Sequence, residues 1–260
     1  MNSAPPPATA RLAWPPLIDG TLIRRYKRFL ADVRLADGTT VTAHCPNSGS
    51  MAECSEPGRP VRLSRHDNPR RKLPYTWEVI EMPTSPVGIN TLVPNRLTAL
   101  ALSAGLIPPL ADYRRVRREV AVGNRSRIDI LAETETGDRC YVEVKNCTLV
   151  TDGLARFPDA VTSRGLKHLE TLAGLKAEGH RCVNFYLIQR MDADRFAPAD
   201  TIDPAYGEAL RRAVAAGVEA LAYDVIIDRD GIALHRRLPV DLARPSAVSP
   251  HPESTRNGGL

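Results

Sequence analysis

The chain has 260 residues, of which 43% are hydrophobic and 25% are charged, and its formal net charge is +5. This length allows one large or two modest domains, and this composition excludes a chain that is disordered throughout. No apolar run is long enough to cross a bilayer, and the N-terminus lacks the basic start and apolar stretch of a signal peptide. We therefore expect a cytoplasmic globular protein with two domains and no membrane partner.

The first predicted domain covers residues 17–82 and follows a Pro/Ala-rich segment, residues 1–16, that we expect to be flexible. It consists of short alternating runs that are separated by turn signals, and Asp37-Gly38 between two of these runs is a strong hairpin signal. The pattern predicts a small antiparallel barrel of the oligonucleotide/oligosaccharide-binding (OB) type. The prolines that follow residue 82 indicate a domain boundary.

This front domain carries most of the positive charge. Residues 1–82 contain 12 Lys/Arg against 8 Asp/Glu, whereas the remaining residues contain 23 against 22. Two of its tracts interleave basic and aromatic side chains, as surfaces that bind single strands do. The alternative, that Tyr26 and Phe29 simply belong to the core, stays open. The predicted nucleic-acid-binding residues of this domain are Arg24, Arg25, Tyr26, Lys27, Arg28, Arg70, Arg71 and Lys72.

The loop and the cysteines between these tracts are less informative. Asn47, Ser48 and Gly49 predict a turn. The five cysteines of the chain are odd in number and form no CxxC pair, so they predict free thiols. His44, Cys45, Cys54 and His66 match no zinc spacing, and the sequence favours neither a metal site nor a cysteine nucleophile there.

The second predicted domain covers residues 83–245 and mixes helices with strands. A tail of flexible composition follows it at residues 246–260. Periodicity predicts three helices and six strands, which together indicate a mixed α/β sheet. In chain order these are a helix at 96–104, strands at 114–122, 126–133 and 140–146, a helix at 163–178, a strand at 182–189, a helix at 204–216, and strands at 218–227 and 231–240.

Two of these strands carry a candidate catalytic group. Alternation places Glu143 and Lys145 on one face of their strand, while Val142 and Val144 enter the core on the other. On the preceding strand, alternation makes Ile128 and Ile130 face away from Asp129. If the two strands pair through the turn at residues 133–139, Asp129 and Glu143 meet at one end of the sheet.

Two carboxylates and a lysine at one sheet end suit a phosphodiesterase that uses Mg²⁺ or Mn²⁺. The acids hold the cation, and the ammonium group orients the attacking water or stabilises the charged phosphorus centre. Glu119 on the strand before could complete the metal shell or could be a surface charge. The simpler alternative for Glu143 and Lys145 is a solvated strand face.

The helix at 163–178 places a polar stripe next to this group. Arg164, Lys167, His168 and Thr171 recur at helical spacing, with leucines on the opposite side. We expect Arg164, Lys167 and His168 to meet phosphates or to orient the site. The alternative for His168 is a polar helix surface.

Seven blocks of the sequence, in order, resemble the bacterial and archaeal sugar fermentation stimulation protein family. They are RRYKRFLADV, HCPNSGSM, NPRRKLPYTWEV, SRIDILA, CYVEVKN, FPDAVTSRGLKHL and LPV. The resemblance implies an OB-like domain, a PD-(D/E)xK nuclease-like domain, and a DNA-binding role in the control of sugar metabolism. By position it puts Asp129, Glu143 and Lys145 on the nuclease motif and Glu119 on the acid that often precedes it.

The predicted fold is therefore an OB-like antiparallel β-barrel followed by a PD-(D/E)xK nuclease-like mixed-sheet α/β domain. The predicted function is DNA binding without sequence specificity, with a nuclease-like Mg²⁺ site and a role in carbohydrate metabolism. The main alternative is an active Mg²⁺-dependent nuclease acting on DNA or RNA. A homodimeric state stays open.

Overall fold

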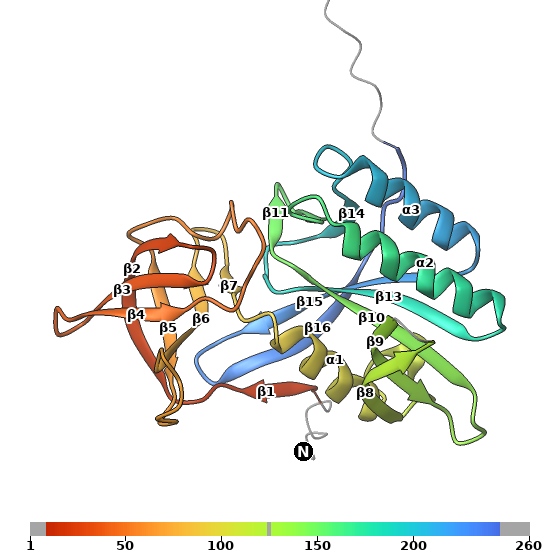
Figure 1. Cartoon of the computed structure of the whole chain (residues 1–260), viewed down its shortest axis with the longest axis horizontal. Coiled ribbons are helices and arrows are strands. Elements are labelled where there is room, and N and C mark those ends of the chain that lie inside the picture. The colour runs from red at the N-terminus through yellow and green to blue at the C-terminus, as the bar shows by residue number, and fades with distance from the viewer. Residues whose placement is uncertain (1–8, 124–125, 245–260) are drawn as a thin grey trace, which may run out of the picture.

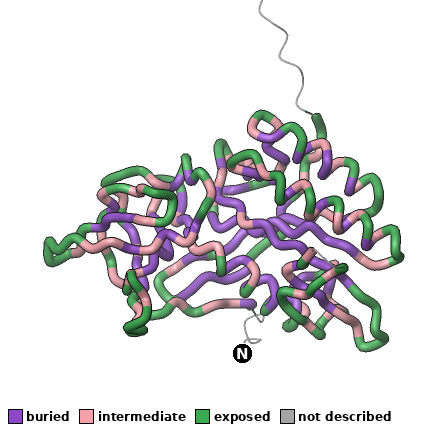
Figure 2. Tube along the Cα trace, viewed as in Figure 1, coloured by how far each residue is buried: buried purple, intermediate pink, exposed green. Residues whose placement is uncertain are grey.

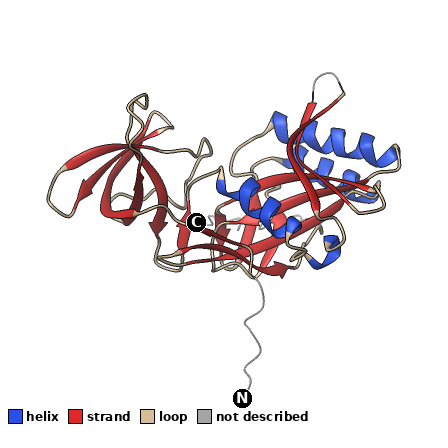
Figure 3. Ribbon diagram, turned by 90° about the horizontal axis from the view of Figure 1, so that it is seen from below, coloured by secondary structure: helices blue, strands red, loops and turns tan. Residues whose placement is uncertain are grey.

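A computed structural model of the chain describes residues 9–123 and 126–244. A small barrel lies beside a larger unit in which helices cover both faces of a long sheet (Figures 1 and 3). The predicted fold class is thus confirmed. The predicted tail at 246–260 lies outside the described residues. Within the described ranges, no helix is long and apolar enough to span a membrane.

The small unit is an OB barrel. Its strands pair in the order β4-β3-β2-β5-β6-β7, and β4 also pairs with β6, which closes a five-stranded barrel from β2 to β6. The predicted Asp37-Gly38 hairpin is confirmed: Gly38 has a φ of 84°, and the Asp37 carboxylate accepts a hydrogen bond from the Thr39 N–H at 2.8 Å. The strands are β2 (Leu17–Tyr26), β3 (Leu30–Leu35), β4 (Thr40–His44), β5 (Pro60–Arg65), β6 (Tyr75–Glu81) and β7 (Pro86–Gly88).

Two short strands that extend the larger sheets lie where the sequence suggested none, in addition to the three strands of the small sheet described below. Strand β7 extends the barrel sheet beyond the expected boundary at residue 82. Strand β1 (Arg11–Ala13) pairs antiparallel with the last strand of the larger unit, so the prediction of a flexible segment up to residue 16 is wrong there. Three residues are too few to show a period, and their partners lie more than 200 residues away, so only the tertiary structure reveals this strand.

The larger unit contains a seven-stranded mixed sheet in the order β1-β16-β15-β13-β10-β9-β8. The three central strands β10, β13 and β15 are parallel, and the outer strands pair antiparallel. Its elements are α1 (Val93–Ser103), a short 3-10 helix (Pro108–Leu110), β8 (Arg115–Val122), β9 (Ser126–Glu133), β10 (Arg139–Cys147), α2 (Ser163–Ala177), β13 (Arg181–Ile188), α3 (Pro204–Ala215), β15 (Glu219–Ile227) and β16 (Gly231–Leu238).

Each face of this sheet has its own core. Helix α1 covers one face with a cluster that includes Val142 and Phe185, which we call the α1-side core. Helices α2 and α3 cover the other with a cluster that includes Leu169 and Tyr186, the α2-side core. Strand β13 is buried at every position after Arg181, which explains why its sequence is nearly continuous in apolar residues (Figure 2).

A third, three-stranded sheet lies at one edge of this unit and was not predicted. It pairs β11 (Leu149–Thr151), β12 (Leu154–Phe157) and β14 (Arg195–Pro198) in the order β11-β12-β14. Strands this short leave little pattern in a sequence. The sheet matters because β10 leads into it and because the segment that follows β12 runs past the candidate site to helix α2.

Candidate active site at the end of strand β10

Strands β9 and β10 form the predicted hairpin and bring the two acids together. Their antiparallel pairing runs from Arg139 opposite Glu133 to Val142 opposite Ile130. Beyond that point the Asp129 carboxylate takes the place of a backbone acceptor: its Oδ2 accepts a hydrogen bond from the Val144 N–H at 2.9 Å. Asp129 is thereby fixed to β10 at the position of Glu143.

The predicted alternation of side chains holds on β10 but fails on β9. Val142 and Val144 pack in the α1-side core, as expected. On β9, however, Ile130 packs in the α1-side core and Ile128 in the α2-side core, although two positions separate them. The change of side falls at Asp129. Local distortion at the site therefore breaks the period on which the prediction rested.

Glu143 is the centre of the cluster, and only 2% of its side chain is exposed. Its Oε1 accepts a hydrogen bond from Lys145 Nζ at 2.7 Å and also contacts His168 Nδ1, whereas its Oε2 is buried without a hydrogen-bond partner. Arg164 Nε donates to His168 Nε2 at 3.3 Å. Lys145 Nζ also lies 3.1 Å from His168 Nδ1, so each ring nitrogen of His168 faces a group that can only donate, and Nδ1 faces Glu143 Oε1 as well.

The two carboxylates have opposite pKa shifts. Burial raises the pKa of Asp129, and the negative charge of Glu143 raises it further, against the hydrogen bonds from Val144 and Asn95. Burial also opposes ionisation of Glu143, but its contacts with His168 and Lys145 outweigh burial and hold its pKa below the usual range. Both acids are thus within reach of each other's charge and of the Lys145 charge, but only Glu143 forms a hydrogen bond with Lys145.

This donor set fits a hard divalent cation. An ionised carboxylate oxygen that is buried and unpaired, like Glu143 Oε2, loses its hydration without compensation, and this costs more than the roughly 1–3 kcal/mol of a neutral group. A cation shared with Asp129 would relieve both this loss and the repulsion between the acids. The described part of the chain contains no group of three or more Asp, Glu, His or Cys side chains suited to a metal. Water would therefore complete the shell, as is usual for Mg²⁺.

Glu119 does not join this cluster, so its prediction as a third metal ligand is not supported. It lies on β8 between Arg118, which pairs with Ile130, and Val120, which pairs with Ile128, and thus faces the level of Asp129. Its side chain is exposed and its φ is +56°, a left-handed backbone that turns it away from regular pairing. Among the described residues, no hydrogen bond joins it to Asp129 or Glu143.

Asn95 is a site residue that the sequence reasoning missed. It lies in the first turn of α1, and its Nδ2 donates to Asp129 Oδ1 at 2.9 Å. Both oxygens of Asp129 are therefore oriented, one by α1 and one by β10. The predicted helix began at Arg96, one residue too late to include it, although Pro94 is typical of a first helical turn and could have indicated the earlier start.

The polar stripe of α2 is divided in its roles. Thr162 caps the helix by accepting a hydrogen bond from the Gly165 N–H at 3.0 Å, and this positions the first turn beside β10. His168 reaches Glu143, and Arg164 holds His168. Lys167 is exposed, and no hydrogen bond or ion pair is formed by its side chain within the described residues. The reading of His168 as a site residue is therefore favoured over that of a helix surface.

The first basic tract of the barrel is only partly available to a ligand. Arg24 forms an ion pair with Asp32 at 2.8 Å, and its guanidinium lies 4.7 Å from the ring centre of Tyr26. The Arg25 guanidinium donates hydrogen bonds to backbone carbonyl groups of a loop. Lys27 and Arg28 are exposed and have left-handed φ values of 46° and 64° in the turn between β2 and β3.

The second basic tract lies in the loop between β5 and β6, away from the turn between β2 and β3. Leu17 at the start of β2 pairs with Ser64 at the end of β5, so this loop and the turn after β2 lie beyond opposite ends of β2. In the loop Arg70 and Lys72 are exposed, while Arg71 donates to the Thr76 hydroxyl at 3.0 Å. The exposed cationic side chains of the two tracts that form no ion pair within the described residues are thus Lys27, Arg28, Arg70 and Lys72.

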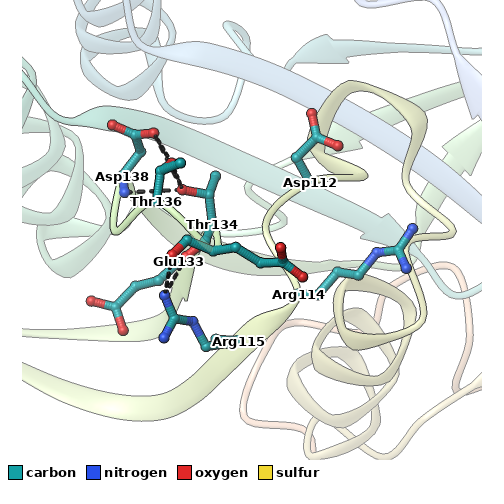
Figure 4. Close-up of a pocket in the computed structure, with 8 residues that line it drawn as sticks. Asp112, Arg114, Arg115, Glu133, Thr134, Thr136 and Asp138 are labelled. Atoms are coloured by element: carbon teal, nitrogen blue, oxygen red, sulfur yellow. Dashed lines mark hydrogen bonds between the residues drawn. The ribbon is translucent and has the colours of Figure 1, made fainter.

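A larger pocket lies elsewhere. It has a volume of about 690 Å³ beside the turn between β9 and β10, and its lining residues include Arg115, Glu133 and Asp138 (Figure 4). This turn is the opposite end of β10 from Lys145, and none of the three predicted catalytic residues lines the pocket. Arg115 donates to the Thr134 carbonyl at 2.6 Å. We therefore assign this pocket to the packing of the turn.

The cysteines do not form a second site. Cys45 and Cys54 are buried as free thiols. Burial raises the pKa of Cys54 to about 12, so this thiol is not a nucleophile at neutral pH.

Comparisons with known proteins cover both units. A family model described as "Sugar fermentation stimulation protein RE domain" matches residues 92–231, and one described as "SfsA N-terminal OB domain" matches residues 23–89. The sugar fermentation stimulation protein homologs of Geobacter sulfurreducens and Pelobacter propionicus are each 56% identical to the chain. The first match covers 86% of this chain and 96% of the homolog, and the second covers 88% and 99%. The structure of Pyrococcus furiosus SfsA in complex with Ca²⁺ is 27% identical, has a TM-score of 0.81, and covers 88% of this chain and 98% of that one.

Proposed function

Because the chain belongs to the sugar fermentation stimulation protein family, with an OB domain and an RE domain, we propose that it binds DNA without sequence preference and cleaves phosphodiesters with a divalent cation. The observation that carries the proposal is the convergence of Asp129, Glu143 and Lys145 around a buried carboxylate oxygen that has no partner. The Ca²⁺ of the Pyrococcus furiosus SfsA complex supports a site for hard cations, since Ca²⁺ and Mg²⁺ both take oxygen ligands.

In this proposal Asp129 and Glu143 hold Mg²⁺ or Mn²⁺. When bound, the ion lowers the pKa of a coordinated water and neutralises charge that develops on the phosphate. Lys145 Nζ leaves Glu143 Oε1 to donate to the attacking water or to a phosphate oxygen. Asn95 and the Val144 N–H keep the Asp129 carboxylate oriented, and His168 contacts Glu143 Oε1 through its Nδ1.

The OB domain supplies the attraction for nucleic acid. Its four exposed cationic side chains, at Lys27, Arg28, Arg70 and Lys72, can meet phosphates, which carry no sequence information. We therefore expect binding that depends strongly on salt and weakly on sequence. RNA, whose backbone carries the same phosphates, remains a second substrate in this proposal.

A second candidate function is DNA binding without cleavage, in the regulation of sugar metabolism. The observation in its favour is that Lys145 and His168 already surround Glu143 Oε1, so this carboxylate has cationic and hydrogen-bonding neighbours without any metal ion. The name of the curated homologs supports a role in sugar fermentation under either candidate.

The experiment that separates the two candidates is a cleavage assay with matched acid variants. Purified protein is incubated with single- and double-stranded DNA and RNA in Mg²⁺ or Mn²⁺, beside Asp129→Ala and Asp138→Ala. Asp138 is an exposed acid at the turn end of β10, which makes it a suitable control. Cleavage that needs metal, disappears in Asp129→Ala and persists in Asp138→Ala is the expected result. Binding without cleavage in either metal leaves only the second candidate.

A further inference from the structure

The turn predicted at Asn47–Gly49 belongs to a loop that joins the OB barrel to the RE domain. From the barrel side, Arg25 donates to the carbonyl groups of Asn47, Gly49 and Ser50 at 2.9–3.0 Å. From the RE side, the Asp159 carboxylate accepts hydrogen bonds from the Met51 N–H and the Ser50 hydroxyl, both at 3.3 Å. We call residues 47–51 the bridging loop.

The bridging loop lies against the RE domain without room for a side chain at Gly49. A Cβ atom at this position would lie 2.4 Å from Asp159 Oδ2, which is closer than real contacts allow. Pro46, which precedes the loop, is also held from outside the barrel: its carbonyl accepts a hydrogen bond from the Thr91 hydroxyl at 2.7 Å. The loop is therefore held in place from both domains.

Asn47 is held in this loop with an unused donor. Its Oδ1 accepts a hydrogen bond from the Gly49 N–H at 2.8 Å, which closes the predicted turn. Its Nδ2 is buried and has no hydrogen-bond partner, and only 4% of the residue is exposed. An unpaired buried donor costs about 1–3 kcal/mol, so such a group calls for an explanation.

The same side chain lines a pocket that Lys145 also lines. The pocket has a volume of about 290 Å³ and lies between the bridging loop and the segment that connects β12 to α2. Its polar lining is rich in groups that can donate hydrogen bonds, namely Asn47, Ser48, Lys145, Asn146, Thr148 and Thr162. The Asp159 carboxylate, which also lines it, is engaged with Ser50 and Met51.

We propose that this pocket binds the phosphate of one unpaired nucleotide next to the phosphodiester at Lys145, with Asn47 Nδ2 donating to a phosphate oxygen. A lysine ammonium can only donate hydrogen bonds, and Asn47, which lines the same pocket, has an unpaired donor, so an anionic acceptor is the matching ligand. The proposal rests on the proposed nuclease site for the identity of the ligand.

The size of the pocket determines the class of substrate. A pocket of about 290 Å³ between two domains has room for one nucleotide but not for a base pair. The substrate is therefore single-stranded nucleic acid, or an unpaired end or gap in a duplex. The OB domain then contributes to the active site itself, and Arg25 acts as a positioning residue that fixes the loop carrying Asn47.

The test uses Asn47→Asp in the full chain. Aspartate keeps the oxygen that accepts from the Gly49 N–H but replaces the unused donor with a second, buried oxygen, so the variant removes the proposed phosphate donor and also costs stability. The matched control is Asn68→Asp, because Asn68 Oδ1 accepts from the Arg70 N–H at 3.0 Å in an exposed turn of the same domain. Both variants add the same charge.

The readout is the fluorescence anisotropy of labelled DNA with Ca²⁺ in place of Mg²⁺, at 0.15 M salt. We expect Asn47→Asp to weaken binding of a 12-nucleotide single strand about tenfold or more, and Asn68→Asp to weaken it less than about threefold. For a blunt duplex of the same length, the two variants should lose affinity equally. The proposal would be overturned if both variants lost the same affinity for the single strand. It would also be overturned if Asn47→Asp lost as much affinity for the duplex as for the single strand.

A second measurement guards against misfolding of Asn47→Asp. In the single strand, one phosphate at a time is replaced by an uncharged methylphosphonate. For the wild-type protein, the replacement should reduce the affinity about tenfold at one phosphate position. For Asn47→Ala, replacing that same phosphate should not reduce the affinity further. Additive losses at every position overturn the proposal. A wild-type protein that shows this coupling but cleaves nothing in Mg²⁺ or Mn²⁺ keeps the pocket and refutes the nuclease, so the two failures are distinguishable.

Discussion

The two domains carry their functional charges in opposite ways. In the OB domain, Lys27 and Arg28 are exposed in a turn, whereas in the RE domain the side chains of Glu143 and Lys145 are 2% and 9% exposed. Exposed charges attract a polyanion from a distance and are screened over about 8 Å at physiological salt. Buried charges act by contact and are screened far less. In the proposed function, the chain thus separates binding of a nucleic acid from its cleavage, and the salt concentration distinguishes the two.

The largest effect on the cleavage rate is expected at Lys145. Its ammonium group forms a hydrogen bond with Glu143, and within the described structure only a protonated His168 would be a second cation in contact with this acid. Lys145→Ala should lower the cleavage rate about 100- to 1000-fold. Since the residue is buried, the loss should be the same at 50 and 200 mM salt. Rates measured at both salt concentrations, beside Arg139→Ala at the turn end of β10, check this. A loss that shrinks with salt would show that Lys145 acts as a surface charge.

The next effect concerns metal binding and stability. Mg²⁺ that binds only the folded protein should stabilise it by about 2.7 kcal/mol at a concentration 100 times its Kd. Glu143→Gln should abolish this gain, while Glu133→Gln, in the same sheet but with its acid 21% exposed, should keep it. Thermal unfolding with increasing Mg²⁺ measures both. The same gain in both variants would place the metal away from Glu143.

Exposed basic residues should have a smaller effect that depends on salt. Lys27→Ala combined with Arg28→Ala should reduce the slope of log Kd against log salt by about 1.8 for duplex DNA. The cleavage rate at saturating DNA should not change. Arg34→Ala is the control, because Arg34 is exposed but pairs with Thr40 at the other end of the barrel. An unchanged slope in the double variant rejects this surface.

The smallest effect is a pH-dependent gain of stability at Asp129. Because burial and Glu143 raise the pKa of this acid, its ionisation costs stability as pH rises through the unfolded value of about 3.9, and the full cost is present above the folded pKa. Asp129→Asn removes that cost. In metal-free urea unfolding, the variant should be more stable than the wild type at pH 7, with a difference that vanishes below about pH 3.5. A variant that is less stable at both pH values contradicts the assigned shift.

The features that the sequence could predict are those set by neighbouring residues. The hairpin of β9 and β10, and the two faces of β10, follow from alternation and a short turn, and so the group of Asp129, Glu143 and Lys145 was found. Asn95 was missed because its role depends on how α1 packs across the sheet. The exposure of Glu119 could not be predicted, because its left-handed backbone has no signal in an Arg-Glu-Val run.

The bridging loop shows a different limit. The sequence predicted the turn at Asn47, and the structure contains it, but its unused amide donor becomes visible only when the RE domain closes the pocket beside it. Likewise, Arg25 stood in a basic tract and was assigned to nucleic acid, whereas it holds loop carbonyl groups. Composition reveals which side chains are charged, and only packing reveals which of them are already engaged.

Strand β1 has a practical consequence for dissecting the molecule. Since Arg11–Ala13 complete the RE sheet before the chain enters the barrel, the OB domain is an insertion between two parts of one sheet. A fragment that starts after the barrel would leave the β16 edge uncovered, and uncovered edges promote aggregation. Linking residues 9–14 directly to the start of α1 through a short Gly/Ser segment would instead remove the barrel and retain all seven strands. The RE domain could then be assayed without the OB domain.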